Sequence, residues 1–363
     1  MKRKIFLAAA ITISYMLLNI TSTKTVETKN IVMLNSKELA ASQLTKKVVV
    51  TGDGLYKDTY EDGKYIYKGT NPNNYIKFNS ELWRILSVEK DGTLKLIKNN
   101  NIGNQLFSNS FSRKEGYCLQ GNAPDWGCNA WDKNNNFVNE SYSGTVTKEA
   151  ELNTYLNIDY YNTFKEEDKK LIKNHAFAIG PVNPKENLHQ QITKENSLTW
   201  TGNVGLISVS EFLKANTNIS SCQTMDLNNT NVETCKQTNY LANQSYWTIS
   251  PENNSTHTVF IVSSGQLSSY LAYDSFTVVP ALYLKSDIFL KGSGTQTTPY
   301  EIANENSITE NTNQSNPTKE VVKVPATAQN ASSIFWIVGI IALLISIGTI
   351  YYILNDIKIN KMD

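Results

Sequence analysis

One stretch of the chain constrains its fold more than any other. Residues 334–354, IFWIVGIIALLISIGTIYYIL, contain no charged side chain. A helix of this length is about 30 Å long, which matches the hydrocarbon core of a bilayer. Trp336 lies near one end and Tyr351 and Tyr352 near the other, as in the aromatic belts of membrane proteins. We therefore expect a transmembrane helix over residues 334–354 and a cytoplasmic tail over residues 355–363.

The N-terminus has the pattern of a secretory signal peptide over residues 1–22. Lys2, Arg3 and Lys4 precede a mostly apolar run that ends at Ile20. The residues before the expected cleavage site match the usual small-residue pattern poorly, so an uncleaved signal anchor stays open as the alternative. Together with the C-terminal helix, this segment predicts a single-pass protein of the cell membrane with its domain on the extracellular side.

Two polar segments separate the expected domain from the two ends. Residues 303–333 are rich in Asn, Thr, Ser and Glu and predict a stalk or linker, and residues 23–49 predict a lead segment. Within the stalk, Val324-Pro325-Ala326-Thr327-Ala328 resembles a sortase-type cell-wall sorting signal. Val324 and Ala328 replace the usual Leu and Gly, so we prefer a plain single-pass anchor and keep cell-wall attachment as the alternative.

Four cysteines form two local pairs, Cys118 with Cys128 and Cys222 with Cys235. Loop-closure entropy favours bonds between near neighbours, and export favours oxidised cysteines. The alternatives are a four-thiolate zinc site and a catalytic thiol, but neither pair is CxxC and no neighbouring histidine offers a base. We predict two disulfides, each of which stabilises the fold by about 2–3 kcal/mol.

Composition and motifs exclude several classes of protein. The 34 Lys and Arg side chains nearly balance the 33 Asp and Glu side chains, unlike a protein that binds nucleic acid through excess cations. The sequence has no nucleophile elbow and no H-E-x-x-H motif, and its three histidines lack metal-ligand spacing. We therefore expect no nucleic-acid partner, no catalytic residues and a protein that is not an enzyme.

The pattern of residues 50–302 predicts strands on either side of a helical middle. Strand patterns cover residues 64–68, 75–79, 82–88, 94–97, 204–208, 246–250, 258–262, 265–270 and 278–284. Helical spacing covers residues 149–157 and 163–174, and Ser208 or Ser210 is expected to cap a helix that runs to Lys214. The first strands suit an antiparallel meander with one face in solvent. This order predicts one α+β domain over residues 50–302.

Several of these segments form an ordered set that matches a known group. They are Leu82-Trp83-Arg84-Ile85, residues 91–97 (DGTLKLI), residues 152–157 (LNTYLN), residues 204–210 (VGLISVS), residues 246–250 (YWTIS) and residues 280–286 (PALYLKS). The set resembles exported surface proteins of low-GC Gram-positive bacteria whose core is similar to the C-type-lectin-like fold of formylglycine-generating enzymes. The resemblance implies a C-type-lectin-like single domain with antiparallel sheets and two or three helices. The group's usual Arg before the last proline is Val279 here, and no cysteine follows Cys235, so copper oxidase chemistry is not implied.

The segment around the first cysteine pair supplies the candidate binding residues. Trp126, Trp131 and Tyr142 lie in polar sequence, and exposed aromatic rings there could stack on sugars or on a protein partner. Alternatively, Trp126 covers the disulfide. Asp132, Asn134 and Asn136 form an oxygen-rich stretch, which suggests either calcium or a solvated loop, because the Gly and Glu of an EF-hand are missing.

These observations favour a membrane-anchored, surface-displayed binding or adhesion module. Its ligand would be a glycan, a cell-wall polymer or a protein. The alternatives are a structural or assembly component of the cell envelope and a secreted enzyme that acts on cell-wall material.

Overall fold

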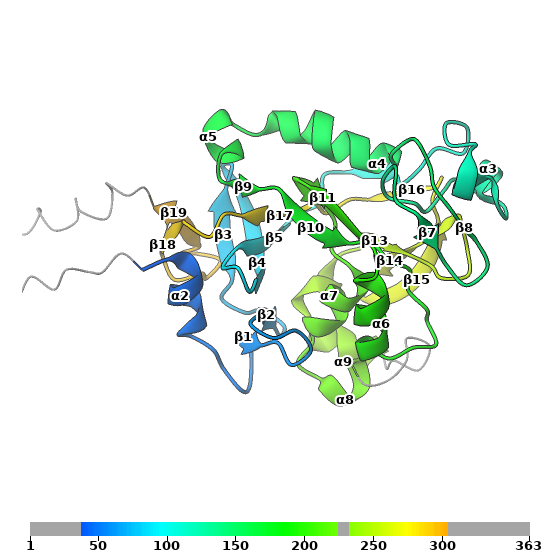
Figure 1. Ribbon diagram of the computed structural model, residues 1–363. Coiled ribbons are helices and arrows are strands. Elements are labelled where there is room, and N and C mark those ends of the chain that lie inside the picture. The colour runs from blue at the N-terminus through cyan, green and yellow to red at the C-terminus, as the bar shows by residue number, and fades with distance from the viewer. Residues whose placement is uncertain (1–37, 224–231, 304–363) are drawn as a thin grey trace, which may run out of the picture. The chain divides into compact units, whose positions relative to one another are not determined.

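A computed structural model describes residues 38–223 and 232–303 of the chain, and a ten-stranded sheet forms its centre (Figure 1). Its strands are β1 (Gly54–Lys57), β2 (Tyr65–Lys68), β3 (Tyr75–Phe78), β4 (Glu81–Val88), β5 (Leu94–Lys98), β9 (Ile172–Lys173), β12 (Val204–Gly205), β17 (Ala281–Leu284), β18 (Phe289–Lys291) and β19 (Tyr300–Ala303). All pairings in this sheet are antiparallel except that of β19 with β3. The predicted α+β class, with mostly antiparallel strands and few helices, is confirmed.

Smaller sheets and short helices surround the central sheet. The remaining strands are β6 (Asn104–Leu106) with β16 (Ser275–Thr277), β7 (Phe137–Val138) with β8 (Ser143–Gly144), β10 (His175–Ala178) with β11 (Thr199–Gly202), and the three-stranded sheet β13 (Tyr246–Pro251), β14 (Thr258–Ser263) and β15 (Gln266–Leu271). The helices are α2 (Ala40–Thr45), α3 (Ala123–Trp126), α4 (Glu151–Thr154), α5 (Glu166–Lys169), α6 (Leu188–Glu195), α7 (Val209–Lys214), α8 (Ile219–Cys222) and α9 (Val232–Gln237).

The central strands differ from the expected meander in one respect: neither face of β5 lies in solvent. All five residues of β5 are buried. Side chains alternate between the faces of a strand, so Leu94 and Leu96 point to one side and Lys95 to the other. Lys95 pairs in register with Tyr283 of β17 and Ser87 of β4. The predicted solvent face is therefore wrong for β5, because Phe177 of β10 and Glu211 of α7 cover Lys95.

Two helical predictions have different outcomes. The helix that begins at α4 continues through a π-helical segment, Tyr155–Tyr160, to Thr163 and agrees with the expected helix over residues 149–157. The helix expected over residues 163–174 is reduced to the single turn of α5. Ile172 instead pairs with Leu284 as part of β9. Pairing with the open edge of β17 overrides the helical spacing, because it buries Ile172 against the sheet.

The described residues include little of the segments expected at the two ends of the chain. The predicted signal peptide, transmembrane helix and cytoplasmic tail fall outside the described residues, as does the sorting-like motif at residues 324–328. Of the stalk predicted over residues 303–333, only Ala303 is described, and it ends β19 because it pairs with Phe289. Of the expected lead segment, residues 38–49 are described and include α2. Within residues 38–223 and 232–303, every helix is too short or too polar to cross a bilayer.

Candidate functional site

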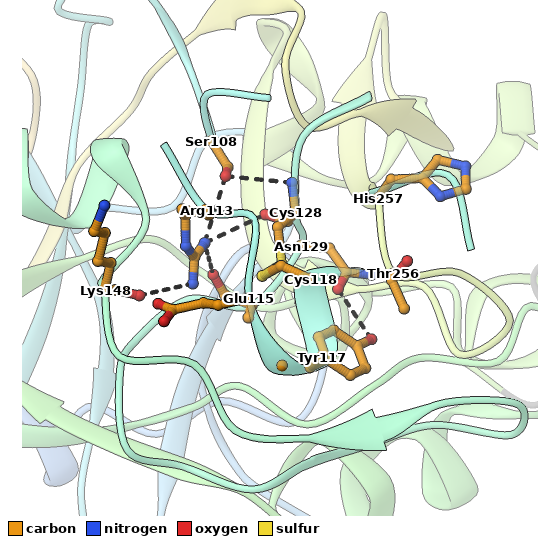
Figure 2. The surroundings of a disulfide bond; sticks show 12 residues. Ser108, Arg113, Glu115, Tyr117, Cys118, Cys128, Asn129, Lys148, Thr256 and His257 are labelled. Carbon is orange, nitrogen blue, oxygen red and sulfur yellow. Dashed lines mark hydrogen bonds between the residues drawn. A yellow bond between two sulfur atoms is a disulfide. The ribbon is translucent and has the colours of Figure 1, made fainter. Parts of the chain in front are cut away.

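Both predicted disulfides are confirmed. Cys118 bonds to Cys128 and Cys222 bonds to Cys235, so the zinc and catalytic-thiol alternatives for these four residues are wrong. Figure 2 shows the first bond among side chains that tie its segment to the core. Buried Arg113 donates to the carbonyl oxygens of Ala130 at 2.6 Å and Lys148 at 3.0 Å. Other residues reinforce this attachment: Tyr117 donates to Asn129, and Thr256 donates to the carbonyl oxygen of Gln120.

The structure separates the three aromatic residues that the sequence grouped together. Trp131 is 0% exposed and packs between Phe107 and Trp200, with ring centroids 5.5 and 5.6 Å away. The expectation that this ring is exposed is wrong, because aromatic residues from distant parts of the chain cover it. Trp126 is 40% exposed and lies 4.8 Å from the His257 ring in an edge-on contact. Tyr142 is half-buried.

The residues of the oxygen-rich stretch also differ in their exposure to solvent. Asn134 and Asn136 are exposed, whereas Asp132 is buried and accepts a hydrogen bond from Asn135 at 2.7 Å. Its second carboxylate oxygen has no partner among the described residues. Burial raises the pKa of Asp132 to about 6, against the opposing hydrogen bond from Asn135. Calcium binding by this stretch stays a prediction. No group of three or more His, Cys, Asp or Glu side chains is placed to hold a metal within the described residues.

A cavity of about 170 Å³ lies against the covered face of β5. We call it the charged cavity and define it by its lining, which combines ionic, hydroxyl and aromatic side chains. The residues that line it are Glu61, Lys64, Glu89, Lys95, His175, Ala176, Phe177, Ala178, Asn196, Thr199, Leu206, Ser208, Ser210, Glu211, Ile249 and Tyr283. Concave sites with a few convergent polar groups are the usual places where proteins bind small ligands.

Lys95 is held at the wall of this cavity by a carboxylate and two rings. Its Nζ lies 2.6 Å from Oε1 of Glu211 and 4.8 and 5.0 Å from the ring centroids of Phe177 and Tyr283. The His175 ring stacks on Tyr283 at 4.0 Å. An ammonium over aromatic faces is attracted by the ring quadrupoles, and the attraction grows when water is excluded.

A second set of ions alternates in sign along one side of the cavity. Lys214 lies 2.8 Å from Asp58 and also bonds to Glu61, and Lys64 lies 3.5 Å from Glu61 and 3.2 Å from Glu89. Asp58, Lys64 and Lys214 are buried. A buried ion pair recovers its desolvation cost only when its geometry is good and its remaining polar atoms are satisfied. Each of the two lysines therefore has two carboxylate partners, which offsets part of this cost.

The carboxylates dominate the electrostatics of the cavity. Burial opposes ionisation of Glu61, but Lys64 and Lys214 outweigh it and lower the pKa of Glu61 to about 2. Burial likewise opposes ionisation of Glu211, but Lys95 and Lys64 lower its pKa below the usual value. Burial on its own would lower the pKa of Lys64, yet Glu89 and Glu61 raise it above the ordinary lysine value. All three groups are therefore charged near neutral pH.

The N-terminus of α7 places Glu211 at the cavity. Ser208 caps the helix by accepting from the backbone N–H of Glu211, and Glu211 in turn accepts from the N–H of Ser208 at 2.9 Å. Buried Glu195, at the end of α6, accepts from the N–H groups of Val209 and Ser210. The first turn of α7 is thus satisfied from two sides, which fixes the carboxylate that pairs with Lys95.

None of the cavity residues was among the candidates that the sequence indicated. The available signal was the position of Lys95, a lysine inside the apolar run Leu94–Ile97. Its alternation was assigned to a solvent face, which is the usual explanation. Its partner Glu211 is 116 positions away along the chain, and no local pattern connects the two residues.

Comparisons with known proteins add one similarity. Residues 129–286 are similar to a family described as a domain of unknown function, DUF6273. This range contains one wall of the charged cavity, from His175 to Tyr283, while Glu61, Lys64 and Lys95 precede it. Searches of the curated proteins and of the solved structures found no match.

Proposed function

We propose that this chain is a surface-displayed, membrane-anchored binding module whose domain receives its ligand in the charged cavity. The observation that carries the proposal is an open space of about 170 Å³ whose wall is built from fixed ions and aromatic rings. The ligand classes are those of the sequence analysis: a glycan, a cell-wall polymer or a protein. The two disulfides support an oxidising location, and the α+β architecture is compatible with a C-type-lectin-like core.

A role in hydrolysing cell-wall glycans is less well supported. Glycoside hydrolysis needs one carboxyl group that is protonated as the general acid and a second that is ionised. Glu61 and Glu211 both line the cavity, and lysines lower the pKa of each. Neither can therefore supply a proton near neutral pH.

The purified full chain, in a mild non-ionic detergent, should be screened on glycan and protein arrays with and without calcium. Ala178 lines the cavity and is half-buried, so Ala178→Leu should fill part of the space and abolish binding of any ligand that enters it. Ala41→Leu, at a half-buried position outside the cavity, is the matched control and should bind as the unchanged chain does.

Two outcomes would contradict the proposal. One is the absence of any ligand for the unchanged chain, and the other is equal binding by the Ala178→Leu variant. If the chain shows no array signal but co-purifies with envelope components, the structural or assembly role takes precedence.

A further inference from the structure

The lining of the charged cavity has an excess of negative charge. It contains three glutamates and two lysines but no arginine, so one negative charge remains when the histidine is neutral. Both lysines already have carboxylate partners, and Lys64 has two. An anionic ligand would compete with these carboxylates for the lysines and would lie beside the excess negative charge, which is unfavourable. A cationic ligand adds a partner without removing one.

Two buried lysines near the charged cavity show how strongly its carboxylates favour a positive charge. Lys64 directly precedes β2 and Lys68 ends it, and both are buried. Burial lowers the pKa of Lys68, as expected for a lysine in a medium of low polarity. At Lys64 the same effect is outweighed by Glu89 and Glu61, and its pKa is raised. The carboxylates of the cavity therefore favour a positive charge in their neighbourhood more strongly than burial disfavours it.

Lys95 shows how the wall of the charged cavity holds a primary ammonium group. The primary ammonium of Lys95 is held by the Glu211 carboxylate on one side and by the Phe177 and Tyr283 rings on the other. A carboxylate with aromatic faces is a general solution for binding an ammonium out of water.

Glu61 is the carboxylate that a ligand can reach. Its side chain is 33% exposed, compared with 12% for Glu89 and 9% for Glu211. Lys64 and Lys214 both contact its Oε2 atom, and among the described residues no donor is found for Oε1. One oxygen of an ionised carboxylate is thus left to accept a hydrogen bond from a ligand.

We propose that the charged cavity recognises a primary ammonium group and that Glu61 accepts its hydrogen bond. The inference deepens the proposed function and rests on it, because it names the chemical class of the ligand. At about 30 Å³ per water, a volume of about 170 Å³ corresponds to roughly six waters, which admits the amine-bearing end of a larger molecule. Amino sugars with a free amine and aminoacyl esters carry this group in extracellular polymers, and lysine side chains carry it in proteins.

Calorimetric titration of the full chain in detergent tests the inference with four probes. Glucosamine is compared with N-acetylglucosamine, and alanine methyl ester with N-acetylalanine methyl ester. We expect at least one free amine to bind at least tenfold more tightly than its acetylated counterpart, because acetylation removes the positive charge. Binding of glucosamine alone identifies an amino sugar, binding of the alanine ester alone identifies an aminoacyl group, and binding of both identifies the ammonium itself.

A pair of matched variants places the interaction at Glu61. Glu61→Gln keeps the shape and removes the charge, and it should weaken binding of the free amine at least tenfold. Glu301→Gln is the control, because Glu301 also pairs with two lysines, Lys77 and Lys291, at an exposed position outside the cavity. Thermal unfolding followed by circular dichroism checks that both variants are folded.

The inference is overturned if neither free amine binds, or if free and acetylated amines bind equally. It is also overturned if the folded Glu61→Gln variant binds as the unchanged chain does. If the arrays meanwhile give a neutral or acidic ligand that Ala178→Leu abolishes, the binding function stands and only the ammonium assignment fails. If the arrays give no ligand, the proposed function itself fails.

Discussion

At the scale of single residues, burial decides what a side chain in this domain can do. Trp126 and Trp131 are five positions apart, yet one ring is at the surface and the other is in the core. Asp132, the residue after Trp131, is also buried, and one of its carboxylate oxygens has no partner among the described residues. Asp132, one of the candidate cation ligands, is therefore also a source of pH-dependent stability.

Asp132→Asn provides a test of this interpretation. Burial raises the pKa of Asp132 to about 6, from about 3.9 in an unfolded chain. Its folded state binds the proton more tightly, so its contribution to stability is full below about pH 4 and is lost as the pH rises to about 6. We expect the variant to match the unchanged chain at pH 4 and to exceed its stability by about 1–2 kcal/mol at pH 7.

Urea unfolding at several pH values between 4 and 7 measures this difference. Asp125→Asn, at an exposed position of the same segment, is the control and should show no such dependence on pH. A constant stability difference between Asp132→Asn and the unchanged chain across this range would disprove the assignment.

At the scale of elements, the start of α7 combines local and distant support. The capping box of Ser208 and Glu211 is encoded within four residues, whereas Glu195 reaches the same turn from α6. The sequence left Ser208 and Ser210 open as the cap, and the structure assigns this role to Ser208. Because Glu211 also pairs with Lys95, the cap of this helix and the wall of the cavity share a residue.

Ser208→Ala should destabilise the domain by about 1 kcal/mol, because it leaves the N–H of Glu211 without its acceptor. Thr193→Ala, at an exposed position of α6, is the control and should change stability by less than about 0.5 kcal/mol. Chemical denaturation of the two variants makes the comparison. Equal effects would mean that the hydrogen bond from Ser208 contributes little to the helix.

At the scale of the whole molecule, the charged cavity joins parts of the chain that are far apart. The ion pairs in its wall and beside it connect the turn before β2, strand β5 and helix α7. Such pairs are expensive to break one partner at a time, because the remaining charge stays buried. These ion pairs therefore couple the stability of the central sheet to that of helix α7.

Lys95→Met should lower the free energy of unfolding by about 3–5 kcal/mol, because it leaves Glu211 buried without its ammonium partner. Lys77→Met is the matched control, because Lys77 pairs with Glu301 at the surface, and it should cost less than about 1 kcal/mol. Urea unfolding monitored by tryptophan fluorescence gives both values. Similar losses for the two variants would show that the pair of Lys95 and Glu211 does not behave as a buried one.

The sequence by itself determined the features that depend on neighbouring residues. The α+β class follows from strand alternation and helical spacing, and the disulfide pairing follows from short loops. The start of α7 was narrowed to Ser208 or Ser210, and the structure assigns the cap to Ser208. Only the tertiary structure decided which polar residues became buried. Lys95 alternates as a solvent-facing lysine would, and only the packing of β10 and α7 over its face turns it into a wall of the cavity. The reason is physical: periodicity reports which side of a strand a residue occupies, whereas contacts between distant segments determine what covers that side.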